Sequence, residues 1–426
     1  MPPAARVLGL ECLRCHTLFE GPRLFTGCPR CRAQGAAVNL TVKLDLAPLM
    51  GLAPDQLAPG HGPRGLWRWS ALMPVRTDRP VTLGEGATPL IHLDRLGRRL
   101  GLGRLYAKDE SQNPTWSYKD RLCAVAVTHA VESGARVVTI ASTGNHGASS
   151  AAYAARAGLA CVIFTLASVP ETMKTLMQAY GAAVVACPTP ESRWRLMREG
   201  VERLGWYPTS GFSVPPIGSN PYGIEGYKTL AYEVAEELGW QAPDLVVVPT
   251  AYSDGLSGIA KGMTELHTLG LIKTIPRMVA AEPFGPLAHA LERGLEAPEP
   301  VEGGDSIAFS IASRYGTYQG LAALRASHGI GVRITDEGVV EAQRALAREE
   351  GIFVEPSSAA ALTAVLQLRH GKAIDPDEVV VVVLTSGGLK DPRASRAWLP
   401  AVPAAPDDFD AVLALLRAHY GLVLDR

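Results

Sequence analysis

Short apolar runs alternate with amphipathic stretches along most of this chain, beginning near residue 104. The apolar runs have the length of buried strands, and the stretches between them have the apolar spacing of helices. Strands are predicted at residues 104–108, 136–141, 160–166, 182–187 and 379–384, and helices at residues 120–132, 148–157, 171–180 and 191–204. Because apolar strands separated by helices form parallel sheets that are covered on both faces, the pattern predicts an α/β fold with doubly wound parallel sheets.

A passage rich in glycine, proline and serine at residues 210–223 interrupts this alternation, and a second α/β set follows it. We interpret the passage as the return from an inserted smaller α/β domain, residues 125–215, to a larger domain formed by residues 47–124 and 216–426. Residues 408–420 have the apolar spacing of an amphipathic helix, which we expect to pack on the body of the protein or to form an oligomer contact.

The composition is that of an ordinary globular protein and argues against several classes of partner. The 41 basic and 42 acidic residues give a net charge of −1, which offers no electrostatic support for binding nucleic acid or an acidic membrane surface. The longest apolar runs, such as residues 379–384, are too short to span a bilayer. No secretory signal is visible at the N-terminus, so we expect a cytoplasmic protein whose partner is a small molecule, with no nucleic acid and no membrane.

Four cysteines near the N-terminus form two pairs with the spacing C-x2-C-x12-C-x2-C. Two such pairs bring four thiolates onto one tetrahedral zinc ion, which would be structural because no coordination position stays open. The alternative is two reduced or disulfide-bonded pairs without a metal. The spacing favours a zinc-ribbon-like module over residues 1–46, with Zn²⁺ bound by Cys12, Cys15, Cys28 and Cys31.

Two further segments carry candidate chemistry. The first ends in a turn at Asn113 and Pro114, and a helix is expected to begin near Ser117, so Lys119 would lie in its first turn. The helix dipole disfavours a cation there, which makes the amine easier to deprotonate and suits it to forming a Schiff base. The second segment, residues 141–148, leads from a strand into a helix N-terminus, which is a ready anion site. The alternative is a surface lysine and an ordinary strand-to-helix turn.

Six motifs in chain order resemble those of the fold-type II pyridoxal-phosphate (PLP) enzymes, and within them the threonine synthases most of all. They are residues 84–90, 113–121, 141–147, 220–226, 351–357 and 384–392. The resemblance implies two doubly wound parallel-sheet domains behind the zinc ribbon, the larger of them binding pyridoxal 5'-phosphate. It also implies an amino-acid substrate and a homodimer.

The resemblance also assigns roles to individual residues. Lys119 matches the lysine that forms the Schiff base with the cofactor and afterwards moves protons on the substrate. Asn145 matches the asparagine that contacts the cofactor's 3'-oxygen, and Thr385 the hydroxyl that faces the pyridine nitrogen. Two loops complete the set: the loop expected to hold the cofactor phosphate contains Ser253, Asp254, Gly255 and Leu256, and the loop expected to receive the substrate carboxylate contains Ser142, Thr143, Gly144 and His146. Ser142 and Asn145 could instead simply cap the following helix.

Several positions depart from the family pattern. The phosphate loop keeps few glycines, and Asp254 puts a carboxylate near an expected dianion. Gly223 stands where threonine synthases generally have an arginine, which we associate with the phosphate of O-phosphohomoserine. Trp116 and Tyr118 replace smaller or apolar residues beside the lysine, and His146 is more typical of threonine dehydratases. If an arginine normally holds the substrate phosphate, another basic residue must replace it, and the candidates are Arg121, Arg314 and Lys228.

The resemblance therefore implies a PLP-dependent lyase that converts O-phospho-L-homoserine and water to L-threonine and phosphate. The alternative is a related enzyme acting on another amino acid, either an ammonia-lyase on threonine, serine or diaminopropionate, or a β-replacement synthase of the cysteate type. A catalytically silent scaffold is a third possibility, and the presence of Lys119, Asn145 and Thr385 argues against it.

Overall fold

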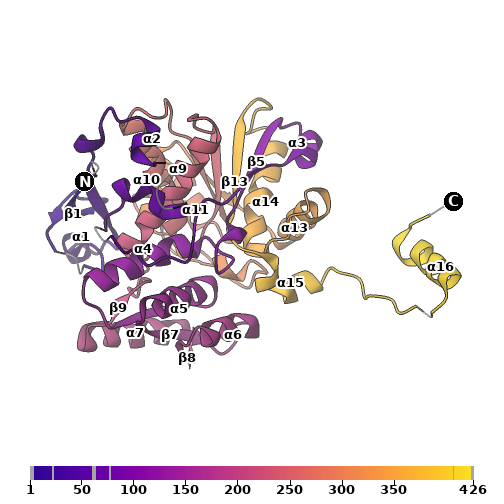
Figure 1. Ribbon diagram of the computed structural model, residues 1–426, viewed down its shortest axis with the longest axis horizontal. Coiled ribbons are helices and arrows are strands. Elements are labelled where there is room, and N and C mark those ends of the chain that lie inside the picture. The colour runs from indigo at the N-terminus through magenta and orange to yellow at the C-terminus, as the bar shows by residue number, and fades with distance from the viewer. Residues whose placement is uncertain (1–3, 22–23, 60–63, 76–77, 406, 424–426) are drawn as a thin grey trace.

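The computed structural model describes residues 4–21, 24–59, 64–75, 78–405 and 407–423, and contains three sheets with their covering helices (Figure 1). The other residues lie outside the described parts. They include residues 1–3, where the predicted zinc-ribbon-like module (1–46) begins, and residues 424–426, where the predicted larger domain ends. Parallel strands form the two larger sheets, so the predicted α/β fold is confirmed.

The largest sheet has six strands in the order β12-β11-β10-β13-β5-β4, and all neighbours are parallel except β4 with β5. Its strands are β4 (Leu90–His92), β5 (Arg104–Asp109), β10 (Leu245–Pro249), β11 (Arg277–Glu282), β12 (Ile330–Arg333) and β13 (Val379–Leu384). Side chains alternate between two apolar clusters: Val246 and Val248 belong to one, and Leu245 and Val247 to the other. Helices cover both faces, which explains why the central strands are continuous apolar runs.

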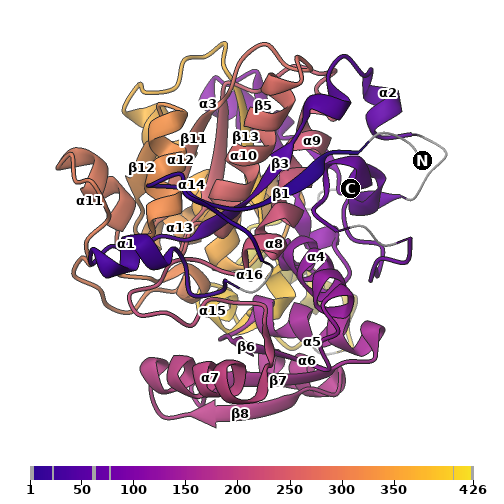
Figure 2. The ribbon, with the colours of Figure 1, turned by 90° about the vertical axis from the view of Figure 1, so that its left-hand side faces the viewer.

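The second sheet lies beneath the first in Figures 1 and 2 and has the parallel order β8-β7-β6-β9. Its elements are β6 (Val137–Ala141), β7 (Ala160–Leu166), β8 (Ala183–Cys187) and β9 (Tyr207–Pro208), with helices α4 (Lys119–Glu132), α5 (Asn145–Ala157), α6 (Glu171–Ala179) and α7 (Pro190–Leu204). The proposed domain boundary between residues 124 and 125 falls inside α4, so the division into domains stays a proposal.

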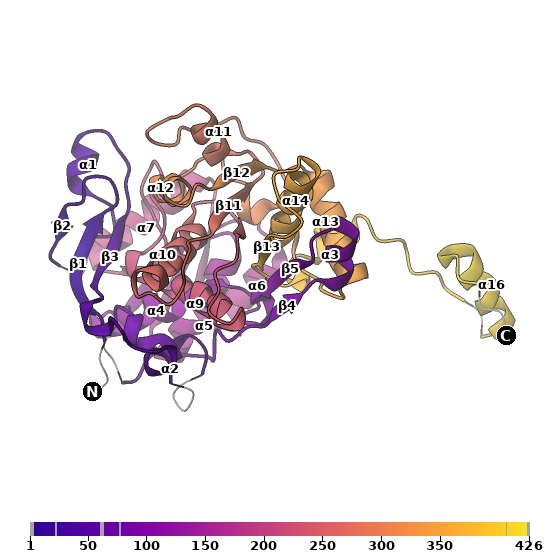
Figure 3. The same cartoon turned by 90° about the horizontal axis from the view of Figure 1, so that it is seen from above.

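The N-terminal region forms a small antiparallel sheet with the order β2-β1-β3, which lies on one side of the body in Figure 3. It contains β1 (Arg6–Cys12), β2 (Leu18–Phe19), α1 (Pro29–Ala33) and β3 (Leu40–Asp45). The Nδ2 atom of Asn39 donates to Ser219 O at 3.0 Å and to Gln319 Oε1 at 3.1 Å. This module is therefore attached to the wall of the pocket described below.

The remaining elements connect and cover these sheets. They are η1 (Ala47–Leu49), α2 (Pro54–Leu57), η2 (Gly65–Leu72), α3 (Asp94–Leu100), η3 (Glu110–Gln112), α8 (Pro221–Ile224), η4 (Glu225–Tyr227), α9 (Lys228–Glu237), α10 (Asp254–Thr268), α11 (Pro286–Glu292), η5 (Phe309–Ile311), α12 (Tyr318–Ala326), α13 (Asp336–Glu349), α14 (Pro356–His370), η6 (Gly388–Lys390), α15 (Pro392–Arg396) and α16 (Phe409–Tyr420). Among the described residues, none of the helices has the length and apolar character needed to cross a membrane.

The C-terminal helix α16 stands clear of the body at the end of an extended segment (Figures 1 and 3). None of its side chains is buried, and Phe409 is 74% exposed. The expectation that this amphipathic helix packs on the body is therefore wrong. An oligomer contact remains the open explanation for its apolar face.

Candidate active site

A cavity of about 470 Å³ lies where loops of the two parallel sheets meet. Its wall includes residues that follow β6, β10 and β13, and the carboxyl ends of parallel strands are where ligands bind in such sheets. The cavity brings together every non-metal site residue that the sequence indicated. These residues are Lys119, Ser142, Thr143, Gly144, Asn145, His146, Ser253, Asp254, Gly255, Leu256 and Thr385.

Lys119 is the first residue of α4, and the turn after β13 fixes where this helix begins. The amide of Tyr118 donates to Thr385 O at 3.0 Å, and the hydroxyl of Ser386 donates to Trp116 O at 3.0 Å. The Lys119 ammonium lies 4.9 Å from the centroid of the Tyr118 ring and 5.8 Å from that of Tyr227. Lys119 and Thr385 are thus held next to each other although 266 positions separate them in the sequence.

The electrostatics of Lys119 differ from the expectation based on the helix dipole. Burial opposes the charged form of its amine, but the surrounding groups, Tyr118 and Asp254 first among them, outweigh burial and raise its pKa above the ordinary value. This direction runs against the prediction that the lysine is easier to deprotonate than usual.

The loop before α5 is organised by Ser142, whose hydroxyl accepts hydrogen bonds from Gly144 N at 3.2 Å and Gly147 N at 2.9 Å. Ser142 therefore caps the start of the helix, which was the simpler of its two interpretations. It also lines the cavity, together with Thr143 and Gly144. An anion bound at this point would meet the N-terminus of a 13-residue helix.

Asn145 is paired with Glu355, a residue to which the sequence gave no role. The Asn145 Nδ2 atom lies 2.9 Å and 3.1 Å from the two carboxylate oxygens of Glu355, and both residues line the cavity. Burial raises the pKa of Glu355 to about 6, against the lowering effect of the bond from Asn145. An amide nitrogen carries two hydrogens, so Asn145 keeps one donor for a ligand.

His146 is 9% exposed, and its Nε2 atom is buried with no hydrogen-bond partner in the described parts of the chain. Burial, and next the charge of Lys119, hold the pKa of His146 well below its ordinary value. The imidazole is therefore neutral, and it offers one unsatisfied nitrogen to the cavity.

The loop expected to hold the cofactor phosphate leads into α10, and two features show that it suits an anion. The Asp254 carboxylate accepts bonds from Ser219 N at 2.8 Å, from Ser219 Oγ at 2.6 Å and from Gln319 Nε2 at 2.8 Å. Both oxygens of this carboxylate are thus bonded to donors within the protein. Ser253 adopts φ +66° just before the helix, and its buried hydroxyl has no partner among the described residues. The start of α10 and this hydroxyl fit a phosphate group.

Gly255 has a packing role as well. A Cβ atom at this position would lie 2.7 Å from the Tyr118 ring, closer than carbon atoms approach. Glycine here lets Tyr118 pack on the start of α10, directly beside Lys119. The absence of a side chain at Gly255 therefore makes room for the large ring of Tyr118, which stands where the family has smaller or apolar residues.

Gly223 does not face the cavity. It lies in α8 against α4, and a Cβ atom there would lie 3.0 Å from Leu122 and 3.1 Å from Ala126. A side chain at this position would begin in the contact with α4, at tighter distances than ordinary packing, so the inference that Gly223 marks an emptied phosphate site is not supported by its position.

Two of the three basic residues considered as replacements are also occupied elsewhere. Arg121 is completely buried between Glu110 and Glu233, each at 2.7 Å, and Lys228 contacts Glu225 at 2.7 Å. Neither residue lines the cavity, whereas Arg314 does. Arg193 of α7, to which the sequence gave no role, lines it too.

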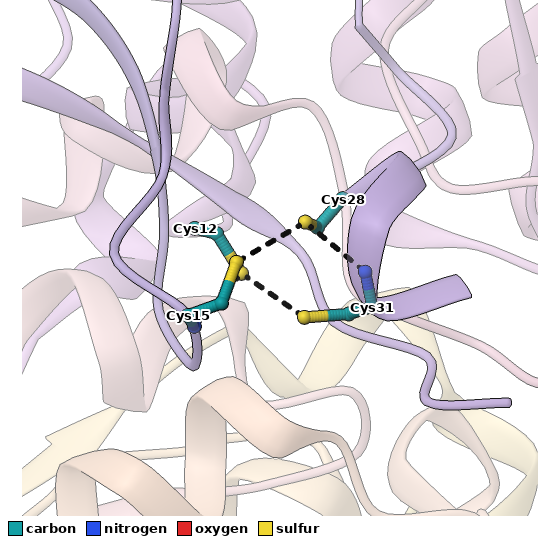
Figure 4. Close-up of side chains that lie close together, drawn as sticks. All are labelled: Cys12, Cys15, Cys28 and Cys31. Atoms are coloured by element: carbon teal, nitrogen blue, oxygen red, sulfur yellow. Dashed lines mark hydrogen bonds between the residues drawn. The ribbon is translucent and has the colours of Figure 1, made fainter. Parts of the chain in front are cut away.

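The four N-terminal cysteines converge at the junction of β1 and α1 (Figure 4). All four sulfur atoms lie within 4.8 Å of one another, with 3.6 Å between Cys12 and Cys31 and 3.7 Å between Cys15 and Cys28. These distances are far longer than a disulfide bond. Zinc–sulfur bonds of about 2.3 Å at tetrahedral angles separate the sulfurs by about 3.8 Å, so the geometry fits a zinc ion.

The sequence is similar to the sequences of known proteins over most of its length. Residues 81–386 match the family described as pyridoxal-phosphate dependent enzyme. The chain is 37% identical to the threonine synthase of Methanocaldococcus jannaschii, covering 78% of this chain and 82% of that protein. It is 33% identical to the threonine synthase of Methanosarcina acetivorans, covering 90% and 92%.

Solved structures share the fold at lower sequence identity. A mutant of O-ureido-L-serine synthase has a TM-score of 0.64 at 21% identity, covering 80% of this chain and 99% of that one. Maize serine racemase has a TM-score of 0.63 at 21% identity, covering 73% and 91%. These likenesses concern the fold alone.

Proposed function

Because this chain belongs to the pyridoxal-phosphate dependent enzyme family and is a threonine synthase-like lyase, we propose that it converts O-phospho-L-homoserine and water to L-threonine and phosphate. The observation that carries this proposal is the shared cavity of Lys119, Asn145 and Thr385, which match the three residues that the family uses to hold the reactive end of its cofactor. The relatives named above supply the choice of reaction.

The residues of the cavity would have different roles toward the cofactor and the substrate. PLP, when bound, supplies an electron sink for charge developing on the substrate. Lys119 would carry the cofactor and afterwards move protons at the substrate's α- and β-carbons. Thr385 would donate to the ring nitrogen, and Asn145, oriented by Glu355, would donate to the ring oxygen. A neutral hydroxyl partner favours elimination and replacement over transamination, because it does not force full protonation of the ring.

Two helix N-termini would hold the anionic groups. The start of α10, with Ser253, Asp254, Gly255 and Leu256, would receive the cofactor phosphate. The start of α5, with Ser142, Thr143, Gly144 and His146, would receive the substrate carboxylate. Backbone N–H groups and the helix dipole favour negative charge at both points.

A PLP-dependent ammonia-lyase acting on threonine or serine is the second candidate. His146 favours it, because a histidine at this position is more typical of threonine dehydratases, and the side chain lines the cavity. A β-replacement synthase of the cysteate type is the other form of this second candidate.

The test compares two assays on the purified, PLP-loaded protein. Phosphate release from O-phospho-L-homoserine with formation of threonine is the expected result. Formation of a 2-oxo acid from threonine or serine, without phosphate release from O-phosphohomoserine, would replace the first candidate by the second. Borohydride reduction followed by mass spectrometry should show the pyridoxyl group on Lys119, and Lys119→Ala should abolish the visible absorption of the covalent adduct.

We also propose that the N-terminal cysteines bind one structural zinc ion. Three of them are buried, and the amides of Arg14 and Cys15 donate to Cys12 Sγ at 3.4 Å and 3.5 Å, as suits a thiolate. Reduced cysteines are required for this coordination, which supports a cytoplasmic location. A homodimer is part of the same proposal, with α16 as an oligomer contact.

A further inference from the structure

Arg193 is a buried cation with no counter-ion of its own. It lies on α7, is 8% exposed and lines the cavity of the candidate active site. Its Nε atom is buried without a hydrogen-bond partner, and the described residues offer its guanidinium no salt bridge. A buried, unpaired charge is costly, so a side chain held in this way is expected to meet an anion that binds there.

The other arginines of the same helix are in a different position. Arg195 contacts Glu199 at 2.9 Å on the surface, and Arg198 donates to Phe212 O at 3.1 Å. The groups that face Arg193 are Tyr252, Cys187 and the exposed Glu191, and burial lowers the pKa of its guanidinium against their effect. Arg203, the fourth arginine of α7, contacts Glu199 at 3.3 Å. Of the four, Arg193 alone lines the cavity and has no hydrogen-bond or salt-bridge partner among the described residues.

The cavity has further polar atoms without partners. Ser310 Oγ, His146 Nε2 and Ser253 Oγ are all buried and unsatisfied in the described parts of the chain, and all three residues line the same cavity as Arg193. Native proteins leave few such atoms, and a group of them in one cavity indicates a polar ligand. The proposed cofactor phosphate and substrate carboxylate account for Ser253 and His146, which leaves Arg193 and Ser310 for another group.

We propose that Arg193 is the specificity-determining residue that binds the phosphate group on the side chain of the substrate. This inference rests on the proposed function, which requires a phosphorylated amino acid. The planar guanidinium presents two parallel N–H donors, a geometry that matches a phosphate better than an ammonium does. Arg193 thus fills the role that the family pattern assigns to the position of Gly223, from a different element of the fold.

The other basic residues are weaker candidates for this role. Arg121 and Lys228 form salt bridges with buried carboxylates outside the cavity. Arg314 lines the cavity, but it is exposed and its guanidinium lies 5.4 Å from the centroid of the Tyr315 ring. Water screens an exposed charge, whereas a desolvated guanidinium binds an anion more strongly.

The test uses the full-length, PLP-loaded protein and four variants: Arg193→Gln, Arg193→Lys, Arg314→Gln and the matched control Arg195→Gln on the same helix. Binding of inorganic phosphate is measured by calorimetry, and KM and kcat are measured with O-phospho-L-homoserine. We expect Arg193→Gln to weaken phosphate binding and to raise KM by about tenfold or more, because a charge-assisted hydrogen bond is lost. Arg193→Lys should keep part of the affinity, and Arg195→Gln should match the parent.

The inference is overturned if Arg193→Gln binds phosphate like the parent, or if Arg314→Gln alone causes the loss. Cofactor content and circular dichroism of each variant show that the protein is folded and loaded. Failure of the proposed function looks different. In that case O-phosphohomoserine is not turned over, yet phosphate binding still depends on Arg193. Normal turnover with an unchanged KM in Arg193→Gln refutes the inference and leaves the proposed function intact.

Discussion

Arg121→Met tests whether a buried ion-pair cluster supports the helix that carries Lys119. Arg121 lies two residues after that lysine on α4 and is completely buried. Its guanidinium contacts Glu110 and Glu233 at 2.7 Å each, and it also bonds Thr229 and Thr88 at 2.9 Å and 3.2 Å. We predict that the substitution destabilises the protein severely, because it removes the cation and leaves the carboxylates buried.

The expected magnitude follows from the cost of an unpaired buried charge and from the lowered pKa of Glu233. Removing one partner of a buried pair costs about 3–5 kcal/mol, because an uncompensated charge remains. Glu110 keeps no other cation among the described residues, while Glu233 keeps Lys108 at 3.0 Å. Burial alone would raise the Glu233 pKa, but Arg121 and Lys108 lower it from 4.5 to about 2. That net shift corresponds to about 3 kcal/mol, and because Arg121 and Lys108 produce it together, it bounds only the order of magnitude of the loss.

The sign of the pH dependence follows from the lowered pKa. A carboxyl whose pKa is lower in the folded state contributes stability above its unfolded pKa, and this stability is lost as the pH falls toward the folded pKa. In the parent protein the contribution of Glu233 is therefore complete above about pH 4.5 and is lost between there and about pH 2. In Arg121→Met only Lys108 opposes the effect of burial, so the folded-state pKa of Glu233 moves up toward the unfolded value and the stability that its ionisation contributes above about pH 4.5 becomes smaller.

The assay is thermal and urea unfolding of the parent and variant at pH 7 and pH 5, compared by midpoints because a chain of this size need not unfold in two states. Arg333→Met is the matched control. Arg333 makes the same two-pronged contact with Glu292, at 2.8 Å and 2.9 Å, but the two side chains are 45% and 56% exposed. Exposed pairs contribute about 0–1 kcal/mol, so this variant should melt nearly like the parent.

A second substitution makes the reasoning refutable. Glu110→Gln in the Arg121→Met background should recover part of the lost stability, since the amide no longer buries an unpaired charge. Equal effects of Arg121→Met and Arg333→Met, or a further loss on adding Glu110→Gln, would show that the cluster does not act through charge compensation.

Three further predictions address the other parts of the molecule. Cys12→Ser, or treatment with a chelator, should release one zinc per chain and lower the melting temperature while the cofactor's visible absorption is kept; metal analysis that finds no zinc in the parent would refute this. Gly223→Arg should not create a phosphate site, and should destabilise the protein by about 1–3 kcal/mol through overpacking against Leu122; improved phosphate binding would contradict it. A chain ending at residue 399, which lacks α16, should be a monomer by light scattering if this helix joins two copies of the parent, and an unchanged dimer would exclude that role.

The strands could be predicted from the sequence where burial on both faces made them continuous apolar runs. Residues 379–384 form β13 with the bounds expected from the sequence. The short strand β9 (Tyr207–Pro208) was missed, because two residues carry no periodicity and proline argues against a strand. Helix α5 begins at Asn145, three residues before the apolar pattern starts, since Ser142 caps it from outside the pattern.

Contacts between distant segments account for what the sequence did not reveal. Glu355 was part of a recognised motif, but its partner Asn145 lies 210 positions away, and no local spacing links the two. The apolar spacing of α16 identified a helix and its apolar face. That spacing contains no information about which surface covers the face, so packing on the body was predicted and does not occur.

Gly223 shows why a motif position need not identify the residue that binds a phosphate. A motif compares the residue type at one position, and the role of that position depends on where its Cα–Cβ bond points. At Gly223 that direction leads into Leu122 and Ala126. An anion is recognised by donors that converge on it in space, and any element that lines the cavity can supply them. In the sequence Arg193 is one of several arginines on an ordinary amphipathic helix. Only its burial, and the lack of a salt bridge among the described residues, distinguish it from Arg195 two residues later.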